Sequence, residues 1–128
     1  MQGADLVLIN GATYEKWLDA VSLPTNVTYD TSDAFAGEFL SSGEVITHSH
    51  GEDGEHTHGG IAGTTWMDFQ QAIWQAEEVH RALSEFDPEN ESAYTEGFNS
   101  LADDLDALHQ EFKAVGLRLK EVPLVGAH

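Results

Sequence analysis

The stretch ADLVLINGA, residues 4–12, decides the fold class of this chain. Residues 6–9 form a continuous apolar run that ends at Asn10 and Gly11, a pair typical of turns. A short apolar run bounded in this way is the pattern of a strand covered on both faces, as in the parallel sheets of α/β proteins. The sequence therefore predicts a buried strand over residues 6–9.

A short helix and a second strand are predicted to follow. Apolar residues recur at helical spacing from Thr13 onward until Pro24 ends the pattern; they are Tyr14, Trp17, Leu18 and Val21. Residues 27–29 then indicate a short strand, and residues 30–40 a loop with one helical turn. This alternation of strand and helix predicts an α/β lobe with a parallel sheet.

Two helices are predicted in the second half of the chain. The first covers residues 66–86, with Thr65 and Asp68 as a capping box and one apolar stripe that comprises Trp66, Phe69, Ile73, Ala76, Val79, Leu83 and Phe86. The second begins at Asp87 and Pro88, and a helix of about thirty residues there would span roughly 45 Å. Its apolar stripe comprises Tyr94, Phe98, Leu101, Leu105, Leu108, Phe112, Val115 and Leu119. Such a helix suits a link between two lobes, and a coiled-coil seam between two copies of the chain is the alternative.

Composition excludes several classes of partner. The 128 residues are 41% hydrophobic, enough for one packed domain, and 5 basic against 23 acidic residues give a formal net charge of -18. This charge disfavours nucleic acid and anionic membrane surfaces, whereas it keeps a chain soluble or concentrates cations around it. No apolar run approaches the roughly 20 residues that span a bilayer, so we expect no direct membrane insertion. Cysteine is absent, so any metal must be held by nitrogen and oxygen ligands.

The candidate metal site lies in residues 43–63, which are rich in Gly, His, Glu and Asp and are predicted to form a mobile loop. The loop carries two His-x-His pairs, His48 with His50 and His56 with His58, separated by an acidic spacer. Neutral imidazole is a good ligand for zinc, copper and nickel, and the glycines allow the chain to fold back and close a chelate. A solvated polar loop and an expression tag are the alternatives.

The other three histidines have weaker indications. His80 and His109 lie at the edges of the predicted apolar helix faces, where surface or boundary packing explains them. His128 ends the predicted apolar strand that begins at Val122, and the carboxyl end of a strand is a favoured position for a ligand.

Several of these segments together resemble a known family. Residues 4–12, the histidine loop, the Thr-Trp-Met-Asp helix start at 65–68, the long helix after Asp87 and residues 123–128 occur in the order found in the zinc and manganese substrate-binding proteins of ABC transporters. The resemblance implies two α/β lobes joined by one long helix, with the metal held between the lobes by histidines and a carboxylate. Residues 1–86 would be the second half of the N-terminal lobe, 87–120 the inter-lobe helix, and 121–128 the first strand of the C-terminal lobe.

The resemblance also assigns ligands and a role. His128 matches a ligand histidine, whereas Thr64 stands where many members carry one, so His58, or His56, would have to replace it. The first family histidine would precede Met1 and the carboxylate would follow His128, so we expect a truncated chain that lacks a visible signal peptide. The implied protein is a periplasmic or membrane-anchored receptor that binds zinc, with manganese or nickel as alternatives, delivers it to a membrane permease and catalyses no reaction.

Two other functions remain open from the sequence. One is a metal-storage or chaperone protein in which the histidine loop is the whole site. The other is a zinc hydrolase in which water fills an open coordination position.

Overall fold

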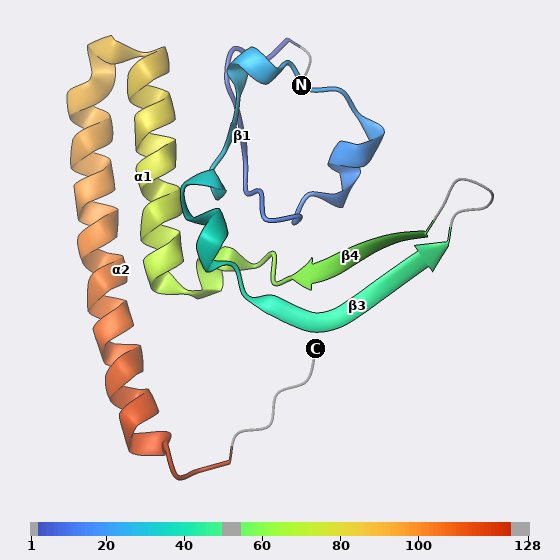
Figure 1. Cartoon of the computed structure of the whole chain (residues 1–128). Coiled ribbons are helices and arrows are strands. Elements are labelled where there is room, and N and C mark those ends of the chain that lie inside the picture. The colour runs from blue at the N-terminus through green and yellow to red at the C-terminus, as the bar shows by residue number, and fades with distance from the viewer. Residues whose placement is uncertain (1–2, 50–54, 124–128) are drawn as a thin grey trace.

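The protein is a mixed α/β structure dominated by two helices. The computed structural model describes the backbone of residues 3–49 and 55–123, and the side chains of residues 3–40 and 61–123. Two antiparallel helices stand beside a small parallel sheet, and a β-hairpin extends from the end of the molecule where the first helix begins (Figure 1).

The parallel sheet pairs β1, Val7–Ile9, with β2, Thr28–Asp30. The register aligns Val7 with Thr28 and Ile9 with Asp30, which confirms both predicted strands and their parallel pairing. Burial on both faces was expected, and this is wrong in the described part of the chain, because Val7 is buried while Leu8 remains 37% exposed.

The predicted helix from Thr13 is also wrong. The connection between the strands holds only two 3-10 turns, η1 at Lys16–Ala20 and η2 at Thr25–Val27. Gly11, Ala12 and Thr13 all have positive φ values, of 74°, 47° and 62°. Three successive residues in the left-handed region cannot belong to a right-handed helix, so the helical turn starts only after them.

A third 3-10 segment, η3 at Asp33–Glu38, leads from β2 toward the hairpin. Its Phe35 is buried, with its ring 5.6 Å from that of Trp74 and 5.7 Å from that of Phe39. This aromatic contact fixes the segment against the first long helix.

That helix, α1 at Phe69–Phe86, starts later than the predicted capping box. The carboxylate of Asp68 is the cap and accepts hydrogen bonds from the backbone N–H groups of Gln70, at 2.8 Å, and Gln71, at 3.3 Å. Thr65 lies instead in a preceding 3-10 turn, η5 at Thr65–Met67, where it is buried. Its hydroxyl bonds to a glutamine in α1 rather than to a helix terminus, which is why it does not cap.

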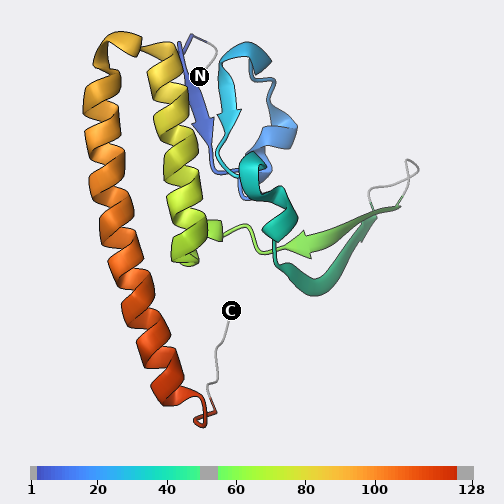
Figure 2. The same cartoon turned by 60° about the vertical axis from the view of Figure 1, so that its left-hand side comes forward.

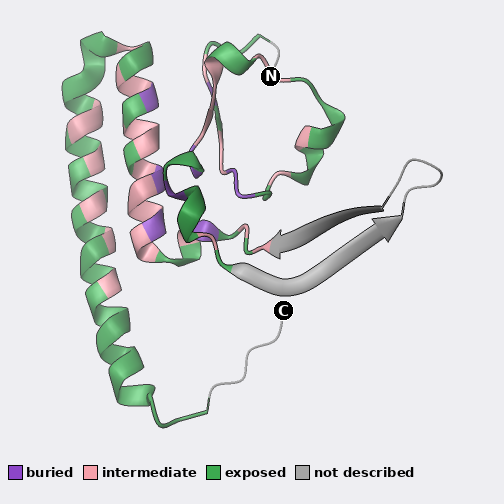
Figure 3. Ribbon diagram, in the orientation of Figure 1, coloured by how far each residue is buried: buried purple, intermediate pink, exposed green. Residues whose placement is uncertain are grey.

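The most deeply buried positions of α1 are Gln71, Gln75 and Ala82, which lie off the predicted apolar stripe. The helix is sandwiched, with the sheet and η3 on one side and the second long helix on the other (Figures 2 and 3). One part of the stripe meets the second helix, where Phe69 and Phe112 form a T-shaped contact at 5.0 Å. Another part lies toward the sheet, where Ala76 and Val79 line a pocket with Leu8 and Ile9 of β1. The buried side toward the sheet is therefore partly polar, a feature that the apolar periodicity does not reveal.

The second helix, α2 at Glu91–Leu119, confirms the prediction of a long helix after Asp87. A short turn, η6 at Pro88–Asn90, precedes it. With 29 residues against 18 in α1, it extends past its partner by about 16 Å. Beyond Phe112 the apolar residues Val115 and Leu117 are exposed, Leu117 by 72%.

The segment after α2 was predicted to begin a new strand. Val122 closes a turn by donating its N–H to the carbonyl of Leu119, at 2.8 Å, and residues 121–123 form no strand. Residues 124–128 lie outside the described residues.

The histidine-rich segment forms strands rather than the predicted loop. β3 at Ser41–Ser49 pairs antiparallel with β4 at Glu55–Ile61. A loop was predicted because the segment has too few large apolar residues to offset the entropy lost on ordering. In the hairpin the backbone N–H and C=O groups of the two strands pair with each other, and this pairing does not require apolar side chains. The β-branched residues Val45, Ile46, Thr47 and Thr57 favour this extended backbone.

Candidate metal-binding site

The hairpin places three of the predicted ligand positions on one face. In its register His48 is the direct partner of His56, and Ile46 is the partner of His58. Residues directly opposite each other, and residues two apart along one strand, lie on the same face of an antiparallel ladder. His48, His56 and His58 therefore occupy neighbouring positions of a single face.

Two predicted ligands cannot be placed. His50 and His128 lie outside the described residues. His80 and His109 lie on the helices, as predicted, and the imidazole Nε2 of His80 is 3.0 Å from the hydroxyl of Thr95 while its ring stacks on Phe98. Among the side chains that the structure describes, no group of three or more His, Asp or Glu residues could hold a metal ion.

The base of the hairpin is closed by backbone pairing between its two arms. Ser41 pairs with Ile61, and the N–H of Ala62 donates to the carbonyl of Leu40 at 2.9 Å. The ladder is irregular between Ser41 and Val45, so the regular part of the hairpin is separated from its base.

Gly63 brings the returning chain against the loop that follows β1. A Cβ atom at this position would lie 2.9 Å from the carbonyl oxygen of Ala12 and 3.3 Å from the backbone of Tyr14. Three residues further on, the ring of Trp66 contacts the ring of Tyr14 in a T-shaped arrangement, with the ring centres 4.7 Å apart. The loop after β1 is therefore the surface on which the hairpin's exit rests.

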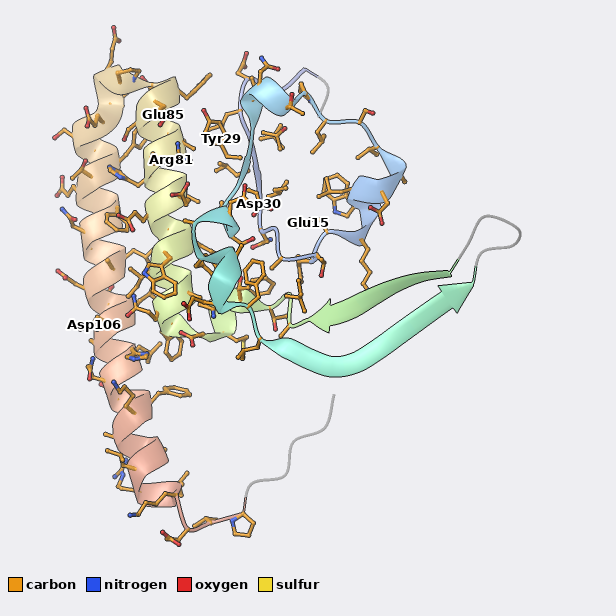
Figure 4. The ribbon with its side chains drawn as sticks, in the orientation of Figure 1. Glu15, Tyr29, Asp30, Arg81, Glu85 and Asp106 are labelled. Carbon is orange, nitrogen blue, oxygen red and sulfur yellow. The ribbon has the colours of Figure 1, made fainter. Side chains whose placement is uncertain are left out.

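Two carboxylates hold this loop in its strained conformation. Glu15 accepts hydrogen bonds from the backbone N–H of Asn10, at 2.7 Å, and of Gly11, at 3.1 Å. Asp30, at the end of β2, accepts from the N–H and the hydroxyl of Ser32 and packs directly against Gly11, where a Cβ would overlap its oxygen. Figure 4 labels both carboxylates. Both sets of hydrogen bonds lie at the carboxyl ends of the two parallel strands.

A buried amide connects the same strand ends to the segment after the hairpin. Gln75 is 7% exposed, and its Nε2 donates to the carbonyl of Asn10, at 3.1 Å, and to the hydroxyl of Thr31, at 3.0 Å. Its Oε1 accepts from the hydroxyl of Thr65 at 3.0 Å, and Thr31 in turn donates to the carbonyl of Ile9 at 2.9 Å. Both the nitrogen and the oxygen of the Gln75 amide are thus hydrogen-bonded.

The apolar periodicity of α1 does not reveal this network, because it predicts a single buried face. The available signal was the pair Gln71 and Gln75, four residues apart, which marks a second helix face carrying polar groups. Thr64, at the position of the ligand in the family resemblance, is exposed, and its carbonyl accepts from the N–H of Met67 at 3.0 Å.

Shifted pKa values occur at the other end of the helices. The pKa of Asp87 is lowered by hydrogen bonds from Asn90 and Tyr94, and the bond between Asp87 and Tyr94 raises the pKa of Tyr94. The pKa of Arg81 is raised by hydrogen bonds to Glu78 and Glu85. Its guanidinium also lies 5.6 Å from the ring centre of Tyr29 in β2 (Figure 4), so this cluster joins α1 to the sheet.

A mixed α/β lobe with a histidine-bearing hairpin is compatible with part of a metal-binding solute receptor. The chain belongs to the family of the periplasmic zinc-uptake complex component A, ZnuA, whose family model matches residues 1–128. Members of this family are solute-binding proteins rather than enzymes, and they are the periplasmic metal-binding components of ABC transporters. The comparison with curated proteins returned no match. No helix in the described part of the chain has the length and hydropathy needed to cross a membrane.

Proposed function

We propose that this chain binds zinc as the cargo of a metal ABC transporter, through His48, His56 and His58 on the hairpin. His50 and His128 are further proposed ligands. The observation that supports the proposal most directly is the hairpin register, in which His48 stands opposite His56 and two positions from the partner of His58.

The chemistry of these positions suits zinc. Opposite residues of an antiparallel pair have Cβ atoms about 4.5–5.5 Å apart, a separation that two imidazole rings can bridge to one ion at the usual Zn–N distance of about 2.0–2.1 Å. An all-nitrogen ligand set favours zinc or nickel over manganese, which prefers oxygen. The formal charge of -18 raises the local concentration of cations around the hairpin.

In the transport cycle the chain would act outside the cytoplasm, free in the periplasm or anchored to the membrane, and would deliver zinc to the permease. The hairpin would capture the ion. His58 would supply the ligand that many family members carry at the position of Thr64. Residues 87–120 would link the two lobes. No covalent step is involved, because binding and release of an ion require only ligand exchange.

Zinc titration against a competing chromophoric chelator tests the proposal. We expect the wild-type chain to bind zinc and the quadruple variant His48→Ala, His50→Ala, His56→Ala, His58→Ala to lose that binding. The matched control is His80→Ala with His109→Ala, which removes two helix histidines and should leave the affinity unchanged. Equal affinity in the quadruple variant and the wild type would exclude the hairpin as the site.

The affinity should also depend on pH and on the metal. Protonated imidazole cannot bind zinc, so binding should weaken as the pH falls through the ordinary histidine range near 6.5. Manganese should compete poorly.

A further inference from the structure

The buried amide of Gln75 is unusual on the sheet-facing side of α1. A buried amide is costly unless its donors and acceptor are bonded, and an apolar side chain could fill the same space without that requirement. Here the amide bonds to Asn10, Thr31 and Thr65 at 3.0–3.1 Å. A fully bonded buried network of this kind specifies one relative placement of the elements that it joins.

The elements joined are the carboxyl ends of β1 and β2 on one side and the exit of the hairpin on the other. Thr65 follows Gly63 by two residues, and Gly63 rests on the carbonyl of Ala12. The segment 63–65 is therefore held at two points, one steric and one through hydrogen bonds. Ile61, two residues before Gly63, pairs with Ser41 at the base of the hairpin, so the contacts of residues 63–65 hold the point at which β4 joins the rest of the protein.

We propose that Gln75, together with Thr31 and Thr65, is a positioning network that sets where the hairpin presents its histidines relative to the carboxyl edge of the parallel sheet. This inference rests on the proposed zinc binding by the hairpin. Gln75 itself touches no metal. It acts through residues 63–65 and bonds to no proposed ligand, so its loss should weaken zinc binding by no more than about tenfold, the low end of the range for groups that hydrogen-bond a ligand directly.

Thr65 offers the cleanest perturbation of the network. Thr65→Val keeps the shape of the side chain and removes the hydroxyl that donates to Gln75, whereas Thr65→Ser keeps the hydroxyl. Thr95→Val is the matched control, because it removes one hydroxyl whose partner is His80, between α1 and α2. Gln75→Met is a second test, since it keeps most of the side-chain volume and leaves no unpaired amide.

Each variant is measured as the full 128-residue chain, with zinc alone as the probe in chelator competition and cobalt(II) visible absorption as the report on ligand geometry. Circular dichroism establishes that each variant is folded. We expect Thr65→Val and Gln75→Met to bind zinc several-fold and up to about tenfold more weakly, with an altered cobalt spectrum. Thr65→Ser and Thr95→Val should retain the wild-type affinity and spectrum.

The outcomes separate the two proposals. If the wild type binds zinc and the folded Thr65→Val and Gln75→Met variants match it in affinity and spectrum, the positioning role is refuted while zinc binding stands. If the wild type binds no zinc, the proposed function itself fails, and the positioning role fails with it. A loss of affinity in Thr95→Val equal to that in Thr65→Val would also refute positioning, because it would reflect a general loss of stability.

Discussion

Replacement of Gly11 by alanine should destabilise the protein strongly. Gly11 has a φ of 74°, and an added Cβ would overlap the carboxylate of Asp30 and the hydroxyl oxygen of Ser32. The left-handed conformation costs an L-residue roughly 1–2 kcal/mol. Displacing Asp30 also breaks its two hydrogen bonds to Ser32, each contributing about 1 kcal/mol. The expected loss of unfolding free energy is therefore about 3–4 kcal/mol.

Two glycines of α2 provide matched controls with the opposite sign. At Gly97 and Gly116 an added Cβ would meet nothing within 4 Å. Alanine in a helix interior is favoured over glycine by roughly 0.5–1 kcal/mol, so Gly97→Ala and Gly116→Ala should each stabilise the protein by that amount.

Urea denaturation followed by far-ultraviolet circular dichroism measures all three variants. Because the m-value should be unchanged, the midpoint alone orders them, with Gly11→Ala lowest and the two α2 variants above the wild type. A midpoint for Gly11→Ala equal to that of the wild type would show that the loop after β1 relaxes freely, and the account of a strained, carboxylate-held loop would be wrong.

Three further predictions concern the hairpin base and the two charged clusters. Gly63→Ala should lower stability by about 1–3 kcal/mol, because the new methyl group crowds the loop after β1, and should weaken zinc binding in the same chelator competition. Asp87→Asn should be less stable than the wild type at neutral pH, and the difference should disappear as the pH falls through the folded-state pKa of Asp87, which lies below the unfolded value of about 3.9, because the charged carboxylate is the form that the hydrogen bonds stabilise. Denaturation midpoints at several pH values measure this, and a difference independent of pH would contradict it. Arg81→Met should lower the free energy of unfolding by at most about 1 kcal/mol, because the ion pairs with Glu78 and Glu85 are solvent-accessible, and the loss should shrink in about 1 M salt. A loss that persists in salt would indicate that packing on Tyr29 is responsible instead.

The local pattern of the sequence was sufficient for the parallel strand pair and the two long helices. The apolar run at residues 6–9 and the short strand near residue 28 pair in parallel, and the stripe that begins at Tyr94 forms the long helix α2. The helix is predicted correctly because an apolar stripe along one side imposes a helical period on the sequence, and the first strand because a short apolar run bounded by turn residues favours an extended backbone. The two His-x-His pairs likewise identify candidate metal ligands by composition alone.

Tertiary structure decided what depends on partners distant in the chain. The strands of the histidine segment need each other's backbone groups, and the one-face placement of His48, His56 and His58 follows from their register rather than from the order of residues. In the sequence Gln75 is not distinguished from other helix residues. In the structure it donates a hydrogen bond to the carbonyl of Asn10, which lies 65 positions away. Backbone pairing and buried polar contacts over such separations leave no periodic trace in the sequence, because any residue with the right donor or acceptor can supply them.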